Sequence, residues 1–436
     1  MTLPHRAKAR LEAVRTLLTN INQNILPGIG FELWDKSTVP AVVTADMPVL
    51  VIADEGVLAA LIRRPSMHTM LNLWVTQRID LRNGSLFDLV AHPANGRPKE
   101  LIKRLDKRQA LTVARKLLFV PRGGPWPLDA VRGDKARTDG TESTNKKNVQ
   151  YHYDVSNEFF ALYLDPEMVY SCAYFKHWNN DLATAQRDKL DMICRKLRLQ
   201  PGDRFLDIGC GWGALVCHAA MHYGVHAHGV SLAEKQYTYA QEKVARLGLK
   251  DKVTLAFCDY TKVDGAFDKI ASIGMFEHVG ATNYPTYFQT INRLLRPGGL
   301  YLHHSIALRA REYERFRRGK SPGIDLGVRY IFPGGTLDHL SMSITNLEHS
   351  GFEVHDVEAW REHYARTCRL WHDRLCANRA AAERELGSVI TRLWIIWLAG
   401  SSVSFARGSL CIYQTLASKR IRGPSGLPPT RADLYR

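Results

Sequence analysis

Residues 203–213 read DRFLDIGCGWG, an apolar run that ends in glycines at alternate positions, Gly209, Gly211 and Gly213. The apolar run predicts a buried strand, and the glycines predict a turn into a helix. Because glycine has no Cβ, its backbone can turn tightly and approach a ligand closely. A dinucleotide-binding turn reads G-x-G-x-x-G, whereas the spacing here is G-x-G-x-G with Asp207 ahead of it. The stretch therefore predicts a ligand-binding turn that departs from the dinucleotide motif.

The sequence after this turn continues as alternating helices and strands. Including the first run, strands are expected at 203–208, 225–232, 252–260, 267–280 and 300–306, with helices at 214–224, 233–249 and 284–296. Such alternation predicts a parallel sheet covered by helices on both faces. In sheets of this kind ligands bind beyond the carboxyl ends of the strands, so functional residues are expected there.

The chain of 436 residues is long enough for two domains. Residues 1–120 mix helical patterns with short β-like runs such as 41–54, and predict a small α/β or α+β domain. Residues 121–147 are rich in Gly, Pro, Thr, Asn and charge, and read as a basic linker ahead of a domain at 148–436. Between residues 101 and 150 there are twelve Lys or Arg and five Asp or Glu, which indicates either an anion-facing patch or a solvated linker.

The formal net charge of +16 favours contact with an anionic partner, either nucleic acid or a membrane surface. Nucleic acid is not expected, because there is no zinc-finger spacing, no aromatic RNA-binding segment and no basic leucine zipper. The eight cysteines are scattered without CxxC pairs or Cys/His spacing, which indicates free thiols in a reducing cytosol and no metal site.

Neither end of the chain predicts insertion into a membrane. The first twenty residues interrupt their apolar positions with charged ones, unlike a signal peptide. The most apolar late run, LWIIWLAG (393–400), is far shorter than the ~20 residues that cross a bilayer. The longer stretch 392–414 predicts a buried pair of helices, with Trp394 and Trp397 alternatively near a lipid entrance. We therefore expect a cytoplasmic protein that touches the inner face of the membrane.

A carboxylate and an imidazole stand side by side in GMFEHVG (274–280), at the end of the fourth strand run. Glu277 and His278 thus lie at the edge of the sheet where ligands are expected. An acid next to a base at this position raises the question of proton transfer.

The run LQPGDRFLDIGCGWG (199–213) resembles the S-adenosylmethionine (SAM) loop of class I methyltransferases. The resemblance implies a Rossmann-like, mostly parallel sheet of seven strands. Many class I methyltransferases grip the SAM ribose with an acidic residue after the second strand, where this chain offers Ser231 and Gln236 instead. The third strand ends in Asp259 and Tyr260, which suit the adenine by hydrogen bonding and stacking, although Asp259 equally suits a helix cap.

Four further stretches narrow the resemblance: YHYDVSNEFFALYLDPEMVYSCAYF (151–175), GMFEHVG followed by NYPTYF, LYLHHSI (300–306) and YIFPGG (330–335). With the glycine loop they resemble the cyclopropane-fatty-acyl-phospholipid synthases and the mycolic acid cyclopropane synthases. The resemblance covers residues 148–436 and implies a catalytic domain with lipid-binding insertions. The phospholipid enzymes carry an extra N-terminal domain, to which residues 1–120 are weakly similar, so lipid binding is one role for that region.

The resemblance implies residues for two ligands. For SAM they are Tyr170, Ser171, Asp207, Gly209, Gly211, Trp212, Gly213, Ser231, Gln236, Asp259 and Tyr260. For a bicarbonate ion they are Cys172, Glu277, His304, Tyr330 and the backbone of Ile306, the four side chains being the catalytic groups. LHHSI contains two histidines, and alignment from Pro297-Gly298-Gly299 selects His304 over His303. His278 then becomes a structural neighbour of Glu277.

The chemistry of an alkene explains why such groups are needed. Methyl transfer from the SAM sulfonium to an isolated double bond leaves a carbocation, and ring closure then requires a base that removes a proton from the new methyl group. Groups that attract positive charge also help. Two adjoining anions repel, so bicarbonate beside Glu277 requires a shared proton, which bicarbonate itself can donate. The aromatic rings of 151–175 either line an acyl tunnel and contact the cation or belong to the core, and Cys172 is either a ligand or a small buried hydrophobe.

We therefore expect a cyclopropane-fatty-acyl-phospholipid synthase that acts on unsaturated phospholipid acyl chains at an anionic membrane surface, with a homodimer among the possible assemblies. A fatty acid C-methyltransferase is the alternative, since proton loss elsewhere or later reduction gives a methylene- or methyl-branched chain. A non-catalytic lipid- or anion-binding module would keep the fold without turnover. A nucleic-acid methyltransferase should show a Pro-Pro-Tyr type segment where this chain has MFEHVG. The basic stretch 307–320 either contacts headgroups or forms an exposed charged helix.

Overall fold

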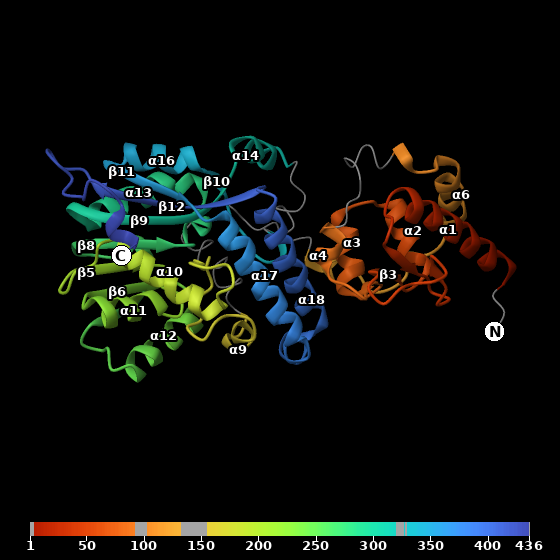
Figure 1. The fold of residues 1–436 in the computed structure, drawn as a ribbon, viewed down its shortest axis with the longest axis horizontal. Helices are drawn as coiled ribbons and strands as arrows, with labels where there is room; N and C mark the ends of the chain where they lie inside the picture. The colour runs from red at the N-terminus through yellow and green to blue at the C-terminus, as the bar shows by residue number, and fades with distance from the viewer. Residues whose placement is uncertain (1–3, 92–102, 132–154, 320–326, 328, 436) are drawn as a thin grey trace. The chain divides into compact units, whose positions relative to one another are not determined.

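The computed structural model describes residues 4–91, 103–131, 155–319, 327 and 329–435. The chain forms two compact units, residues 1–133 together with 386–399, and residues 134–385 together with 400–436 (Figure 1). Most of the predicted linker, and with it much of the basic stretch 101–150, lies outside the described residues. The described part of the linker contains a short helix, α7 (Pro127–Val131).

The N-terminal unit contains a four-stranded sheet in the order β2-β1-β3-β4. Its strands are β1 (Gly30–Glu32), β2 (Thr38–Val39), β3 (Val49–Ile52) and β4 (Ile79–Arg82). Its helices are α1 (His5–Asn24), α2 (Glu55–Arg63), α3 (Met67–Val75), α4 (Leu86–Ala91) and α6 (Lys107–Leu117). Of the β-like run 41–54, only Val49–Ile52 form a strand, β3.

The second unit is built on a sheet in the order β11-β12-β9-β8-β5-β6-β7, with the two-residue β10 added beside β9. The strands are β5 (Arg204–Ile208), β6 (His226–Ser231), β7 (Val253–Phe257), β8 (Phe267–Ile273), β9 (Leu295–Leu308), β10 (Asp338–His339), β11 (Phe352–Ala359) and β12 (Leu410–Lys419). Strands β5 to β9 pair in parallel, and β12 runs antiparallel to both of its neighbours. The predicted class I methyltransferase fold is therefore confirmed.

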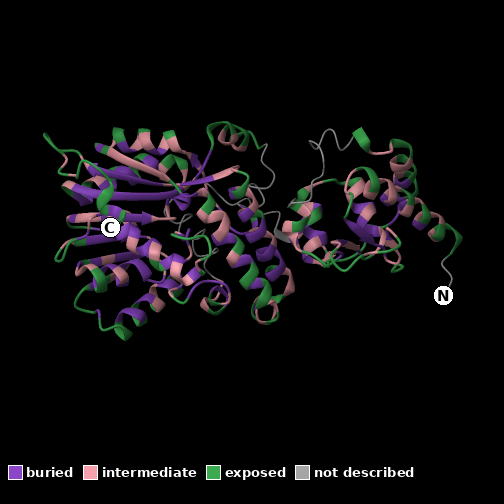
Figure 2. Cartoon of the chain, viewed as in Figure 1, coloured by how far each residue is buried: buried purple, intermediate pink, exposed green. Residues whose placement is uncertain are grey.

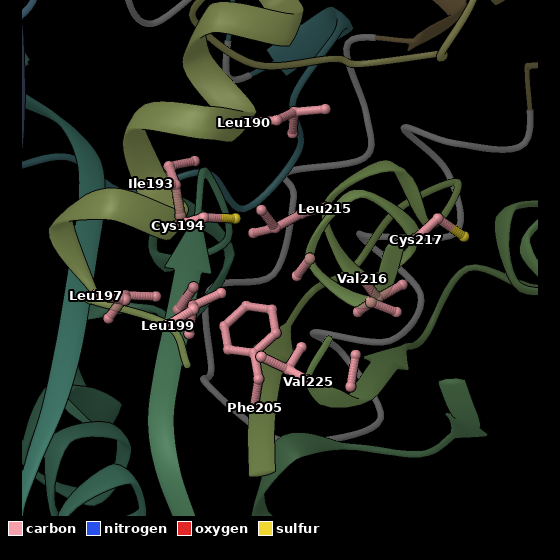
Figure 3. Close-up of a cluster of buried hydrophobic side chains, with 14 of the residues drawn as sticks. Leu190, Ile193, Cys194, Leu197, Leu199, Phe205, Leu215, Val216, Cys217 and Val225 are labelled. Atoms are coloured by element: carbon pink, nitrogen blue, oxygen red, sulfur yellow. The ribbon is translucent and has the colours of Figure 1, made fainter. Parts of the chain in front are cut away.

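Helices cover both faces of this sheet. The helices of this unit are α9 (Asn157–Ala161), α10 (Leu182–Lys196), α11 (Ala214–Tyr223), α12 (Glu234–Arg246), α13 (Tyr284–Leu294), α14 (Ala310–Arg317), α16 (Leu340–His349), α17 (Arg361–Ala377) and the two ends of α18 (Arg379–Ala406), whose residues 386–399 belong to the N-terminal unit, with 3-10 turns η1 (Tyr260–Lys262), η2 (Phe276–His278), η3 (Ala281–Asn283) and η4 (Ala432–Tyr435). Phe205 of β5 packs in a cluster with α10 and α11 (Figure 3), whereas its neighbour Leu206 packs in a cluster with α13. Because successive side chains of a strand point to opposite faces, these clusters mark the two sides of the sheet, whose strands are largely buried (Figure 2).

Three of the predicted elements differ clearly from the structure. The strand predicted at 267–280 ends at Ile273, and η2 follows it. Strand β9 begins at Leu295 instead of Leu300, because Leu295 already pairs with Phe267 of β8; the Pro-Gly-Gly segment forms an irregularity before the ladder resumes at Leu300. The predicted helix pair at 392–414 is wrong: α18 ends at Ala406, Gly408 turns the chain with φ +69°, and Leu410–Lys419 form β12. The basic stretch 307–320 contains α14, an exposed charged helix in which Arg315 pairs with Glu312.

Within the described residues, α18 is the helix with the length and apolar composition to cross a membrane. It has 28 residues, so the run LWIIWLAG belongs to a longer helix than its eight letters suggest. Half of its most apolar window is buried inside the protein, as in a core helix. A non-helical Gly387, with φ +78°, interrupts it near its start.

Candidate active site

The glycine loop follows β5 at the carboxyl edge of the sheet. Gly209, Gly211 and Gly213 have φ of +82°, +54° and +81°. The backbone N–H groups of residues 209 and 210 both donate to the Val230 carbonyl at 3.0 Å, which fixes the loop against β6. A Cβ on Gly209 would lie 2.8 Å from Met275 Cγ, so this position requires glycine for both its conformation and its space.

A cavity opens beside this loop. Its wall contains every residue predicted to bind SAM except Gly213, namely Tyr170, Ser171, Asp207, Gly209, Gly211, Trp212, Ser231, Gln236, Asp259 and Tyr260. Gly213 instead begins α11 and faces Ala240, whose Cβ would be 3.1 Å from an added Cβ. The residues predicted to bind SAM thus line one cavity at the carboxyl ends of the strands.

Asp259 has one of the two roles considered for it, that of a helix cap, and its contact with adenine stays a prediction. Its Oδ1 accepts from the backbone N–H of Thr261 at 2.9 Å and from the Thr261 hydroxyl at 2.6 Å, so it caps η1. The same residue also lines the cavity. Trp212, which also lines the cavity, donates a 2.8 Å hydrogen bond from its Nε1 to Asn157 Oδ1.

A buried lysine lies in the cavity wall between two of the predicted residues. Lys189 of α10 donates to Ser171 Oγ at 2.9 Å, and its charge also acts on Asp207. Burial lowers the pKa of Lys189 to about 8 and raises the pKa of Asp207 to about 7. The ammonium group of Lys189 and the carboxylate of Asp207, which have opposite charges, thus both lie in the cavity wall.

Glu277 lies just past the end of β8, in η2, and is buried. Its Oε1 accepts from the backbone N–H of Ile306 at 2.6 Å, which holds the carboxylate against β9. Its Oε2 has no hydrogen-bond partner among the residues that the structure describes. Burial raises the pKa of Glu277 to about 7, although the Ile306 N–H acts in the opposite direction. This carboxyl group can therefore exchange a proton near neutral pH.

The two histidines of LYLHHSI point to opposite faces of β9. His303 joins the α13 side, where its Nδ1 lies 3.0 Å from the Tyr301 hydroxyl and its Nε2 lies 3.0 Å from the Ser305 hydroxyl. His304 lies on the α10 side, edge-on to Trp360 at 5.5 Å. Its Nδ1 contacts Gln414, and its Nε2 lacks a partner within the described chain. Glu277 accepts the Ile306 N–H in the plane of the sheet, two residues along β9 from His304.

Cys172 and Tyr330 complete the predicted anion site. Cys172 is fully buried, and its Sγ lies 3.8 Å from the Trp360 carbonyl, beside the ring that His304 contacts. Burial raises the pKa of the Cys172 thiol, so it remains protonated. Tyr330 is buried in the YIFPGG segment, which joins the Glu277 turn through the Thr336 N–H to Glu277 carbonyl bond of 2.9 Å.

His278 stacks on Phe332 of the same YIFPGG segment, with ring centroids 4.1 Å apart, and also lines the SAM cavity. Within the described residues 155–175, several aromatic side chains belong to the core. Phe159, Phe160 and Tyr163 are fully buried and pack edge to edge or tilted on one another.

Three polar residues near the site were missed by the sequence prediction: Lys189, Lys196 and Gln414. A signal for the lysines exists, because both lie among the buried positions of α10 with Gln186. Charged side chains on the apolar face of a helix are seldom buried without a partner, so this pattern marks a polar site beneath the helix. Gln414 has no comparable signal, because the stretch 392–414 predicts helices where the structure has the strand β12.

Comparison with known proteins matches residues 141–415 to the mycolic acid cyclopropane synthetase family. The chain belongs to this family. A probable fatty acid methyltransferase of Pseudomonas putida is 43% identical over 296 residues, which cover 67% of this chain and 74% of the relative. The cyclopropane-fatty-acyl-phospholipid synthase of Escherichia coli K12 is 36% identical over 270 residues, 62% of this chain and 67% of the relative.

Among solved structures, the mycolic acid cyclopropane synthase CmaA1 complexed with SAH and CTAB is 35% identical, with a TM-score of 0.60. The match covers 63% of this chain and 98% of CmaA1. The family member described here is accordingly a SAM-dependent methyltransferase, and the cavity beside its glycine loop lies where this fold binds SAM.

Proposed function

We propose that this cyclopropane synthetase family member is a cyclopropane-fatty-acyl-phospholipid synthase. It transfers a methylene group from SAM to the cis double bond of an unsaturated phospholipid acyl chain. The supporting observation is a pair of buried polar atoms beyond the SAM cavity, Glu277 Oε2 and His304 Nε2, neither of which has a hydrogen-bond partner among the described residues. Buried polar atoms are nearly always paired, so each of these two atoms favours a small polar ligand as its partner.

The chemistry of the donors fits a bicarbonate ion. Glu277 with a raised pKa can share a proton with an anion, and a neutral imidazole, the Ile306 backbone region and the hydroxyl of Tyr330 supply polar surroundings. Cys172 is a protonated thiol beside them. When bound, bicarbonate would supply the base that the methyl proton requires, held by Cys172, Glu277, His304 and Tyr330. The backbone of Ile306, also expected to hold the ion, has its N–H engaged by Glu277 Oε1 and would act on the ion by positioning that carboxylate.

The side chains and backbone of the protein would orient SAM and exclude water from the site. SAM supplies an electrophilic methyl group, and Tyr170, Ser171, Asp207 and the glycine loop would orient it at the strand ends. Tyr170 is itself held between Phe160 and Trp371, each 5.2 Å away between ring centroids. Burial of the site excludes water, which would otherwise capture the carbocation before ring closure.

A fatty acid C-methyltransferase is the second candidate, because the Pseudomonas putida relative with 43% identity carries that description. Both reactions share the carbocation and differ in which proton leaves it and whether reduction follows. The residues proposed to bind SAM and bicarbonate would suit the formation of either product.

Mass spectrometry of lipids distinguishes the candidates. We expect that purified protein, labelled SAM and vesicles of unsaturated phospholipid yield a labelled acyl chain that is heavier by one methylene group. A methylene-branched isomer would be separated from the cyclopropane by fragmentation. In lipids of cells that express the protein, where a reductant is present, a saturated methyl-branched product would be two hydrogens heavier than the cyclopropane. Either branched product would support the second candidate, and absence of label would support a lipid-binding module without turnover.

We further propose that the protein is cytoplasmic and meets the inner face of an anionic membrane through its N-terminal unit. Helix α6 exposes Leu111, and the chain just after it exposes Leu118 and Phe119, the last with 89% of its surface accessible. Exposed basic residues flank them: Lys107, Arg108, Arg115 and Lys116. A helix that combines exposed apolar and basic side chains is suited to lie in the headgroup region of a bilayer.

Replacing Leu111 and Phe119 together by serine should weaken binding to anionic vesicles at least about 10-fold, because burying one large apolar side chain is worth roughly 1.5–3 kcal/mol. Vesicle co-sedimentation at low and high salt measures this loss. Val42→Ser serves as the matched control, since Val42 is also exposed (78%) in the same unit but lies outside the α6 segment. Equal binding by the double variant and the control would contradict the proposed surface.

A further inference from the structure

A row of polar side chains crosses three strands behind the proposed anion site. His304 of β9 lies opposite Gln414 of β12, and Gln414 lies opposite Glu358 of β11. Lys196, the last residue of α10, lies against this row. Its Nζ donates to Gln414 Oε1 at 2.7 Å and to the Glu358 carboxylate. Gln414 Nε2 in turn lies 2.8 Å from His304 Nδ1. Lys196, Gln414 and His304 are each at most 1% exposed, so water does not compete for these bonds.

The lysine determines which way the Gln414 amide points. An ammonium group only donates hydrogen bonds, so the amide oxygen must face Lys196 and the amide nitrogen must face His304. The amide nitrogen also only donates, and His304 Nδ1 must therefore accept. A neutral imidazole that accepts at Nδ1 carries its proton on Nε2. This is the ring nitrogen that lacks a partner in the described part of the chain.

The surroundings also disfavour an imidazolium at this position. Burial lowers the pKa of His304 well below its ordinary value, and the charges of Lys189, Lys196 and His303 act in the same direction. Glu358, the carboxylate of the row, is engaged by Lys196. A second ring proton would also place an N–H of His304 against the N–H of Gln414.

We propose that Lys196 and Gln414 are positioning residues that hold His304 in its Nε2–H form, so that the imidazole donates a hydrogen bond into the site and does not accept the substrate proton. This inference rests on the proposed function, because the anion of that reaction would be the acceptor of the Nε2–H bond. It assigns proton removal to a group other than His304, and it gives the buried Lys196 a role that SAM binding does not require.

Nitrogen-15 NMR of the full-length protein labelled at histidine tests the tautomer without substrate, SAM or added bicarbonate. The His304 signals are those that disappear in His304→Asn. We expect protonated Nε2 and unprotonated Nδ1 in the unmodified protein. In Gln414→Glu, a carboxylate that only accepts replaces the amide, so Nδ1 should become protonated. Turnover of this variant should fall roughly 10- to 100-fold, as is common for residues that orient a histidine ligand, with SAM affinity unchanged.

Lys196→Met releases the amide, so both His304 tautomers should appear and turnover should fall by a similar factor. Lys243→Met is the matched control: Lys243 is also buried and paired with a glutamate, Glu167, but on α12. It should leave the His304 signals unchanged. A protonated Nδ1 in the unmodified protein, an unchanged tautomer in Gln414→Glu, or full turnover with a reversed tautomer would each overturn the inference. If the protein makes no cyclopropane but shows the expected tautomer, the proposed function fails and the Lys196–Gln414 assignment of the proton stands.

Discussion

Replacing Glu277 by glutamine should abolish most of the turnover while leaving SAM bound. Glutamine has nearly the same shape, and its amide oxygen can still accept the Ile306 N–H that Glu277 accepts at 2.6 Å. It cannot carry a negative charge or exchange a proton at the position of Oε2. We expect turnover to fall about 100- to 1,000-fold, the usual cost of removing one group that stabilises charge in a transition state. Added bicarbonate should not restore it.

Labelled methyl transfer into unsaturated phospholipid measures turnover, and calorimetry measures SAM affinity. Glu362→Gln is the control, because Glu362 is a surface carboxylate whose side chain is 67% exposed. Full activity of Glu277→Gln would remove Glu277 from the proposed mechanism. A parallel loss of SAM binding would instead place its effect on the cofactor cavity.

Glu277→Gln should also change how the free energy of unfolding depends on pH, in a direction that the raised pKa of Glu277 determines. Burial raises the pKa of Glu277 from an ordinary 4.5 to about 7, so between these pH values the folded protein keeps a proton that the unfolded chain has released. The stability contributed by Glu277 is therefore complete below about pH 4.5 and is lost as the pH rises through about 7. Glu277→Gln lacks this loss. Relative to the unmodified protein, its free energy of unfolding should increase from pH 4 to pH 8, as urea denaturation at both values can show.

Much of the fold follows from the sequence because its signals are local. The apolar runs at β5 to β9 are each bounded by turn residues, and Gly224 ends α11 with φ +67° as a helix-terminating glycine should. The SAM cavity could also be foreseen, since parallel strands bring their carboxyl ends to one edge. Residues that follow different strands therefore come together at that edge and can line one cavity.

Strand β12 could not be predicted in the same way. Its sequence, LCIYQTLASK, follows a long apolar helix closely and has no regular alternation of apolar and polar residues. What makes it a strand is its pairing with β9, more than a hundred residues earlier in the chain. The sequence therefore did not predict Gln414 as a residue near the site. The lysines of α10 were missed for another reason: their partners, Ser171, Glu358 and Gln414, come from three separate segments that only the folded protein brings together.

The choice between His303 and His304 shows what the alternation of side chains along a strand can predict and what it cannot. Period-two alternation establishes that only one of the two can face α10, but it does not say which. The packed clusters do, because Tyr301 lies with α13 whereas Leu300 and Leu302 lie with α10 and α11. His304 shares the face of Leu300 and Leu302, and thus the face of the buried lysines.

The glycine loop offers the second large effect, at Gly209. Alanine there should lower SAM affinity about 100-fold, because two costs combine. A non-glycine residue in a left-handed conformation costs roughly 1–3 kcal/mol, and φ is +82° at this position. The new Cβ would also lie 2.8 Å from Met275 Cγ and 2.9 Å from Met275 Cβ, so the loop must move away from the turn that carries Glu277. A displaced loop no longer presents its backbone to the cofactor.

Gly248→Ala separates these two costs. Gly248 has a left-handed φ of +67°, but a Cβ there meets nothing within 4 Å, and it does not line the cavity. It should therefore lose only the conformational part of the stability, measured as a small drop in the melting temperature, and keep full SAM affinity. If Gly209→Ala bound SAM as tightly as Gly248→Ala, the close approach of Met275 would have no bearing on cofactor binding. If it lost affinity with a melting temperature like that of the control, the loss would lie in the loop's position against the cofactor, as the contact with Met275 requires.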